Sequence, residues 1–216
     1  MDLVDVVTER TTAATDAALA LAAAAAILVL RGTTPPSFGR AVWQAAFAAL
    51  ALASVLGAVA HGLELPPATR QLLWQPLYLA LGVTMALFVV GAVRDWRGEA
   101  AARRVLVPML ALAMVFYGIT WLTHGSFLAF VVYEAAALLF SLGVYLRLAM
   151  GPTRVGAAPM AAALAVSLAA GVVQAAGVGP VRLIWDFDHN GVFHLVQLVG
   201  LALLVTGLRR LLASTA

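Results

Sequence analysis

The stretch AALALAAAAAILVL, residues 17–30, decides the fold class of this chain. It contains no polar side chain, and residues 157–173 are almost as apolar. The whole chain of 216 residues is 63% hydrophobic and 11% charged. An ordinary soluble domain has about 25% charged residues. This composition therefore indicates an integral membrane protein.

Seven segments of the sequence meet the requirement for a membrane-spanning helix, which is about 20 mostly apolar residues. Short connections rich in glycine, proline and arginine separate them. We expect the helices at residues 14–31, 41–62, 71–93, 105–124, 127–148, 157–178 and 189–208. The sequence thus predicts an all-α integral membrane protein, a bundle of seven transmembrane helices, with residues 1–216 as one domain. The very short connection after the fourth segment predicts a tight antiparallel pair of the fourth and fifth helices.

The arginines predict the orientation of this bundle. Ten of the 13 lie in the first, third and fifth connections and at the C-terminus, and the other three lie on the opposite side: Arg10, Arg70 and Arg182. Short cytoplasmic loops carry the excess of positive charge in membrane proteins. We therefore expect the N-terminus outside and the C-terminus in the cytoplasm, in a multi-pass protein of the bacterial inner (plasma) membrane.

Two missing residue types narrow the chemistry. The chain has no lysine, so it cannot form a retinal Schiff base, and retinal is excluded as a cofactor. It has no cysteine, which excludes disulfides and thiolate metal ligands. Its arginines are scattered among connections and form no nucleic-acid-binding patch. We expect membrane lipids as partners, and no nucleic acid.

The most polar stretch, WDFDHNGVFHLVQ at residues 185–197, leads into the last predicted helix. In the expected orientation, all four histidines and Glu134 fall in the outer third of the bilayer. Ionisable residues at such depth are candidates for function by default. Four polar residues follow a spacing of four, four and three that places them on one helix face: Asp186, Asn190, His194 and Gln197. Such a face must turn toward the bundle interior.

Three chemistries fit histidines that converge with a carboxylate. A zinc ion with three protein ligands and an open position can activate a water that attacks a lipid amide or ester. Titrating side chains can instead form a proton or substrate path, and a polar pocket can simply bind a ligand. The candidate metal ligands are His61, His124 and His194, and the candidate catalytic residues are Glu134, Asp188 and Asn190. Glu134 would serve as a general base or a third ligand.

The histidine positions carry a resemblance. Seven helices with His61 near the end of the second and His194 in the stretch NGVFH resemble the membrane-hydrolase superfamily of alkaline ceramidases, adiponectin and progestin receptors and hemolysin-III-like proteins. In that superfamily one histidine of helix 2 and a His-x-x-x-His pair of helix 7 bind zinc. The resemblance implies that His61 and His194 are ligands. Asn190 stands at the first position of the pair, so His124 or Glu134 would supply the third ligand.

Together, these residues predict a metal-dependent membrane hydrolase of a lipid-type amide or ester, with zinc as cofactor and a lipid-like substrate. A non-catalytic ligand-binding or sensor protein of the same architecture is the first alternative. A proton-coupled transporter is the second, although the inner half of the predicted bundle offers no matching polar relay.

Overall fold

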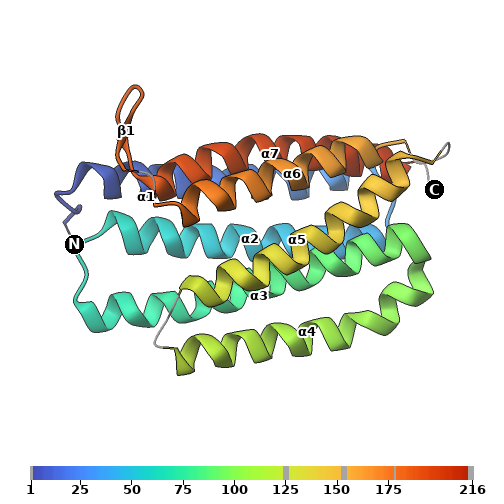
Figure 1. The fold of residues 1–216 in the computed structure, drawn as a ribbon, viewed down its shortest axis with the longest axis horizontal. Coiled ribbons are helices and arrows are strands. Elements are labelled where there is room, and N and C mark those ends of the chain that lie inside the picture. The colour runs from blue at the N-terminus through green and yellow to red at the C-terminus, as the bar shows by residue number, and fades with distance from the viewer. Residues whose placement is uncertain (1, 124–126, 152–154, 178, 214–216) are drawn as a thin grey trace.

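The computed structural model describes residues 2–123, 127–151, 155–177 and 179–213. Over these residues the chain forms seven long helices and a short β-hairpin (Figure 1). The helices are α1 (Val7–Thr33), α2 (Phe38–Gly62), α3 (Pro67–Arg97), α4 (Glu99–Leu122), α5 (Phe127–Ala149), α6 (Ala157–Ala175) and α7 (His189–Ala213). All seven are long and apolar enough to cross a membrane. The prediction of an all-α architecture with seven such helices is confirmed.

Most helices extend beyond the apolar segments that predict them at one or both ends, whereas α6 ends at Ala175, before the predicted residue 178. α3, for example, is four residues longer at each end than the predicted 71–93. Hydropathy detects the apolar middle of a helix, whereas the backbone hydrogen bonds continue until a cap or a loop ends them. At the start of α2 this cap is the Ser37 hydroxyl, which accepts a hydrogen bond from the backbone N–H of Arg40 at 3.1 Å.

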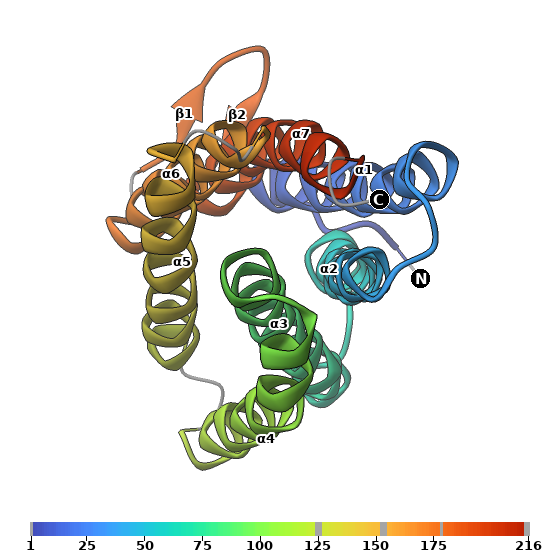
Figure 2. The ribbon, with the colours of Figure 1, turned by 90° about the vertical axis from the view of Figure 1, so that its right-hand side faces the viewer.

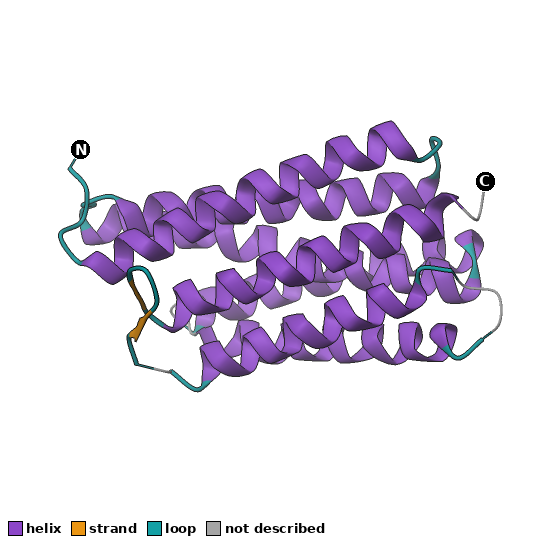
Figure 3. Ribbon diagram, turned by 90° about the horizontal axis from the view of Figure 1, so that it is seen from above, coloured by secondary structure: helices purple, strands orange, loops and turns teal. Residues whose placement is uncertain are grey.

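Six helices form a ring, and the seventh lies outside it. Contacts between neighbours close the ring in the order α1, α2, α3, α5, α6, α7 and back to α1. Viewed end-on, α4 lies outside this ring and packs on α3 (Figure 2). The helices run along a common long axis, as the view from above shows (Figure 3).

The predicted tight pairing of α4 with α5 is wrong. α4 packs along α3, while α5 diverges from α4 and crosses toward α6 (Figure 1). The two helices touch through aromatic rings, with Phe116 stacked on Tyr133 at a centroid distance of 4.7 Å and tilted against Phe130. A short connection fixes where two helices meet, but side-chain packing sets the angle at which they cross.

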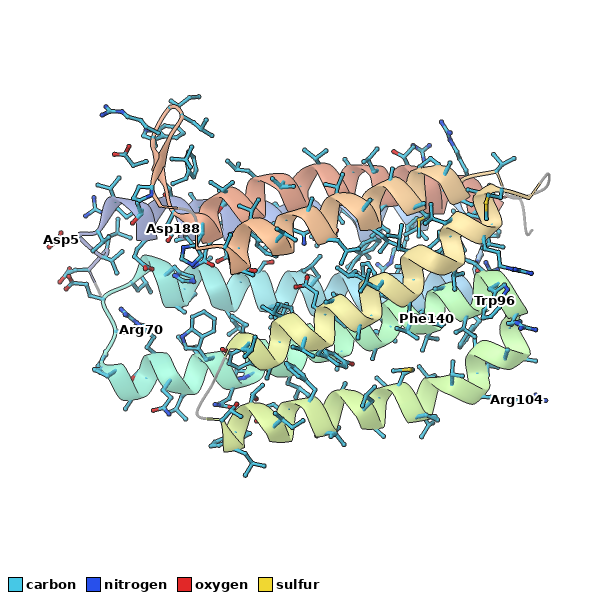
Figure 4. All side chains as sticks on the ribbon, viewed as in Figure 1. Asp5, Arg70, Trp96, Arg104, Phe140 and Asp188 are labelled. Carbon is cyan, nitrogen blue, oxygen red and sulfur yellow. The ribbon has the colours of Figure 1, made fainter. Side chains whose placement is uncertain are left out.

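The two ends of the bundle differ in the residues they carry. α2 ends and α7 begins at what we call the polar end, where Asp5, Arg70 and Asp188 lie (Figure 4). Trp96 and Arg104 lie at the opposite end (Figure 4). We call this the arginine end, because α1, α3, α5 and α7 each carry arginine in the last turn there.

A β-hairpin stands at the polar end between α6 and α7. Its strands are β1 (Val181–Arg182) and β2 (Asp186–Phe187), and they pair antiparallel. The hairpin projects sideways from the ring (Figures 1 and 2). Three large apolar residues are exposed at its tip: Leu183, Ile184 and Trp185.

The hairpin corrects one prediction from the sequence. Asp186 does not share the polar face of α7, because it lies in β2 opposite Arg182, and α7 begins only at His189. Helical spacing placed Asp186 one turn before Asn190, but the chain is extended there. The other three residues of the predicted face do lie on α7.

Close packing holds α2 against α3. Trp43 of α2 is fully buried and meets Phe88 edge-to-face, with ring centroids 5.1 Å apart. A Cβ atom at Gly91 would lie 2.5 Å from Cζ2 of Trp43. Glycine at this position therefore allows the two helices to approach closely, as small residues do between membrane-type helices.

A buried ionic group ties α3 to α5 near the arginine end. The Asp95 side chain, 1% exposed, accepts a hydrogen bond from Nη1 of Arg94 at 2.8 Å. Its second oxygen accepts one from the hydroxyl of Tyr145, also at 2.8 Å. Tyr145 is fully buried. Both carboxylate oxygens thus have donors, which a buried charge requires.

Candidate functional site

The ring of six helices encloses a cavity of about 420 Å³. This volume falls within the range of roughly 300–1,000 Å³ that is typical of small-molecule sites. The lining residues of α7 extend from His189 to Leu204, which corresponds to roughly 22 Å at the rise of an α-helix. The cavity is therefore long and runs from the polar end well into the bundle.

The cavity is polar at one end and apolar at the other. Its polar-end lining includes the side chains Asp16, His61, Glu134, Gln174, Asn190, His194 and Gln197. Deeper along α7 and α5, the lining becomes apolar, with Leu201, Leu204 and Leu138. No arginine belongs to the cavity lining among the residues the structure describes. This distribution fits a molecule with a polar head and an apolar tail.

His194 joins α7 to α1 at the centre of the polar lining. The hydroxyl of Thr15 donates to the carbonyl of Thr12 at 2.9 Å and lies 3.0 Å from Nδ1 of His194. A hydroxyl has one hydrogen, so when it is given to the Thr12 carbonyl, Nδ1 donates the second bond. In the neutral ring Nε2 is then an acceptor, and it lies 3.5 Å from Oδ1 of Asp16. His194 and Asp16 can therefore hold one proton between them.

Asp16 is seated against a glycine of α2. The Asp16 side chain is only 8% exposed. A Cβ atom at Gly57 would lie 2.6 Å from its Oδ2 atom. The missing side chain at Gly57 leaves the space that this carboxyl occupies.

His61 has a carboxylate partner of its own. Its Nδ1 atom lies 2.6 Å from Oε2 of Glu9, which comes from the first turn of α1. The imidazole also meets the ring of Trp74 edge-to-face, with centroids 5.5 Å apart. Both contacts fix the orientation of the imidazole at the mouth of the cavity.

The polar face of α7 is tied to α6. Nε2 of Gln174 donates to Oδ1 of Asn190 at 2.9 Å, and the hydroxyl of Ser167 donates to Oε1 of Gln197 at 2.8 Å. The Oε1 atom of Gln174 is buried, and in the described part of the chain it has no hydrogen-bond partner. Asn190 therefore serves at least to orient Gln174.

Glu134 is the second buried carboxyl of the cavity lining, and it comes from α5. Its residue exposure is 6%, and within the described residues no hydrogen bond or ion pair engages its side chain. A Cβ atom at Gly171 of α6 would lie 4.0 Å from its Oε2 atom. Glu134 thus faces the cavity beside the same helix that carries Gln174.

Of the residues proposed from the sequence, Asp188 is absent from the cavity lining that the structure describes. Asp188 caps α7, because its Oδ1 atom accepts from the backbone N–H of Gly191 at 2.8 Å and from the Thr12 hydroxyl at 2.7 Å. Its acidic side chain also suits the positive end of the helix dipole. His124 lies outside the described residues.

The structure places two of the three predicted zinc ligands at the cavity. His61 and His194 both line the cavity, but each is engaged by a carboxylate. Among the described residues, no three histidine, aspartate or glutamate side chains are grouped so that they could hold a metal ion. Zinc binding therefore stays a prediction from the sequence.

The contribution of α1 to the site was not predicted from the sequence. Thr12, Thr15 and Asp16 lie on one buried face of this helix, and Glu9 extends the polar surface toward His61. One signal was available, because Asp16 falls inside the predicted span 14–31, where a carboxyl is costly. Its partner across the bundle could not be identified without the fold.

A family of related sequences matches nearly the whole chain. The sequence profile of DUF6962, a family of unknown function, matches residues 11–213. The chain belongs to this family. The matched range includes both Asp16 and His194, so the family's sequence unit spans the whole ring and its cavity. No curated protein and no solved structure matches the chain.

Proposed function

We propose that this protein binds an amphipathic, lipid-type molecule inside its helix bundle, with the head group at the polar end and the tail in the apolar part of the cavity. The observation that carries this proposal is the shape and polarity of the cavity, which runs roughly 22 Å along α7 from polar to apolar lining. A site of this kind fixes its ligand with a few polar groups and gains affinity from apolar burial.

Narrowing the apolar part of the cavity tests the proposal. Ala163 of α6 is buried and lines the cavity, while its neighbour Ala162 is exposed on the outside of the ring. We expect Ala163→Leu to weaken binding of a dodecanol analogue by about tenfold, because hydrophobic pockets discriminate strongly at the scale of a methylene. Ala162→Leu, the matched control, leaves binding unchanged.

The measurement uses dodecanol with a diazirine in its chain, added to the protein in phosphatidylcholine nanodiscs. After irradiation, mass spectrometry maps the labelled residues, and competition with unlabelled dodecanol gives the affinity. Saturable label on Leu138 or Leu204 is expected. Label confined to the exposed apolar residues of α4, such as Val107 and Met114, would mean that the probe only dissolves in lipid, and the proposal would be wrong.

In this proposal the chain crosses a bacterial plasma membrane seven times, with the polar end outside. The excess of arginine at the opposite end supports this orientation. Because the chain contains no cysteine, single cysteines report it cleanly. We expect Leu183→Cys, in the exposed hairpin, to react with a membrane-impermeant maleimide in intact cells. Ala100→Cys, exposed at the start of α4, should react only after lysis, and the reverse pattern would invert the orientation.

Hydrolysis of a lipid-type amide or ester is a second candidate, as the resemblance of His61 and His194 to zinc-dependent membrane hydrolases suggests. The observation in its favour is the Asp16–His194 contact, which can hold and release a proton beside the cavity. Metal analysis of purified protein tests it. Stoichiometric zinc that is lost in His61→Ala and His194→Ala would support the hydrolase, and its absence from the wild-type protein would remove it.

A further inference from the structure

Two hydrogen-bonding groups that line the polar end of the cavity have no donor among the described residues. The carboxyl of Glu134 and the Oε1 atom of Gln174 are both buried and have no partner among the described residues. Both border α6, because a Cβ atom at Gly171 would lie 4.0 Å from Oε2 of Glu134 and Gln174 is one turn further along that helix. Buried acceptors without donors are costly, so this place favours a ligand that donates hydrogen bonds.

The positive charge that would balance Glu134 is also missing. Two other carboxylates near the cavity have histidine partners, Asp16 with His194 and Glu9 with His61. The chain has no lysine, and no arginine lines the cavity in the described part of the structure. Glu134 is therefore a carboxyl of the cavity lining that forms no hydrogen bond or ion pair with the described residues.

Aromatic side chains also line the cavity from α3 and α5. Phe130 precedes Glu134 by one turn of α5, and Trp74 and Tyr78 line the cavity from α3 with ring centroids 5.9 Å apart. The negative faces of such rings attract cations, most strongly where water is excluded. A carboxylate beside aromatic rings is a suitable environment for an ammonium group.

We propose that the amphiphile bound by this protein carries a protonated amine as its head group, held by Glu134 and the Gln174 carbonyl. This inference rests on the proposed function, because it specifies the head group of the molecule in the same cavity. The ammonium supplies a positive counter-charge for the Glu134 carboxylate. It also supplies N–H donors for the Glu134 carboxylate and the Gln174 carbonyl. Its alkyl tail occupies the apolar part of the cavity.

Three probes of equal chain length test the head group: dodecylamine, dodecanol and dodecanoate, each competing with the photoreactive dodecanol. We expect dodecylamine to compete at a concentration roughly tenfold lower than dodecanol, because charge-assisted hydrogen bonds replace neutral ones. Dodecanoate should be the weakest, since its charge repels Glu134. In Glu134→Gln, which keeps the shape of the side chain, the advantage of the amine over the alcohol should disappear.

Two further variants make the result specific. Glu64→Gln removes an exposed carboxylate at the same end of the bundle, outside the cavity lining, and should keep the full preference for the amine. Phe130→Leu should reduce amine binding while leaving dodecanol binding nearly unchanged, and it serves as the test if Glu134→Gln does not fold. Thermal unfolding of each purified variant establishes folding.

The outcomes separate the two proposals. If dodecanol and dodecylamine label and compete equally within the cavity, amphiphile binding stands and the cationic head group is wrong. A preference for the amine that survives both Glu134→Gln and Phe130→Leu would also overturn the assignment of the site. If no probe labels the cavity, both proposals fail.

Discussion

Asp95→Ala should destabilise the protein by about 3–5 kcal/mol, the largest effect on stability that we expect from a single substitution. The carboxylate is almost fully buried and accepts hydrogen bonds from Arg94 and Tyr145. Removing it takes the acceptor from a buried hydroxyl and the nearest counter-charge from a largely buried guanidinium. Because the three residues join α3 to α5, the loss should appear in thermal or denaturant unfolding of the protein in detergent.

Two milder substitutions calibrate this prediction. Tyr145→Phe removes one donor to the charged group and should cost about 1.5–3 kcal/mol. Glu99→Gln breaks the ion pair with Arg103, whose partners are 60% and 47% exposed, and should cost no more than about 0.5 kcal/mol. If Asp95→Ala were as mild as Glu99→Gln, the buried group would not stabilise the contact between α3 and α5.

Gly91→Ala should destabilise the protein by about 1–3 kcal/mol, although alanine is the better helix former. The added methyl group would meet the indole of Trp43 at 2.5 Å, and the fully buried indole has no open space to move into. The measurement is again the unfolding midpoint, with ligand-free protein.

A matched control and a second-site variant make this expectation sharp. Gly118 of α4 has no atom within 4 Å of the position its Cβ would take, so Gly118→Ala should be neutral or slightly stabilising. Trp43→Phe shortens the side chain that Gly91→Ala would meet. The double variant should therefore be less destabilised than the sum of the two single changes, and simple additivity would contradict the proposed contact.

Hydropathy predicts the number of helices well, because residues 14–31 and the six other apolar segments each satisfy a length requirement set by the bilayer. Spacing along one helix also predicts which residues share a face. Asn190, His194 and Gln197 line the cavity from α7, as their spacing of four and three suggests. These properties depend on local sequence alone.

Contacts between helices could not be predicted in the same way. The partners of His61 and His194 are Glu9 and Asp16, about 50 and 180 residues away along the chain, and both come from α1. The helical spacing wrongly placed Asp186 on α7. Its pairing with Arg182 in the hairpin depends on where α6 ends, which the spacing does not reveal. The divergence of α4 and α5 follows from packing on α3 and α6, which a short connecting segment does not reveal.

The position of α4 outside the ring has a consequence for how the family can diverge. Its residues contribute nothing to the cavity lining that the structure describes, and most of its surface is exposed. Side chains of α4 must be compatible with the surrounding lipid and with α3. Side chains of the ring helices that line the cavity must also be compatible with the proposed ligand. Under the proposed function, the exposed positions of α4 can therefore vary among members of the family without a change in the bound molecule, while one change at Glu134 would alter which molecule is bound.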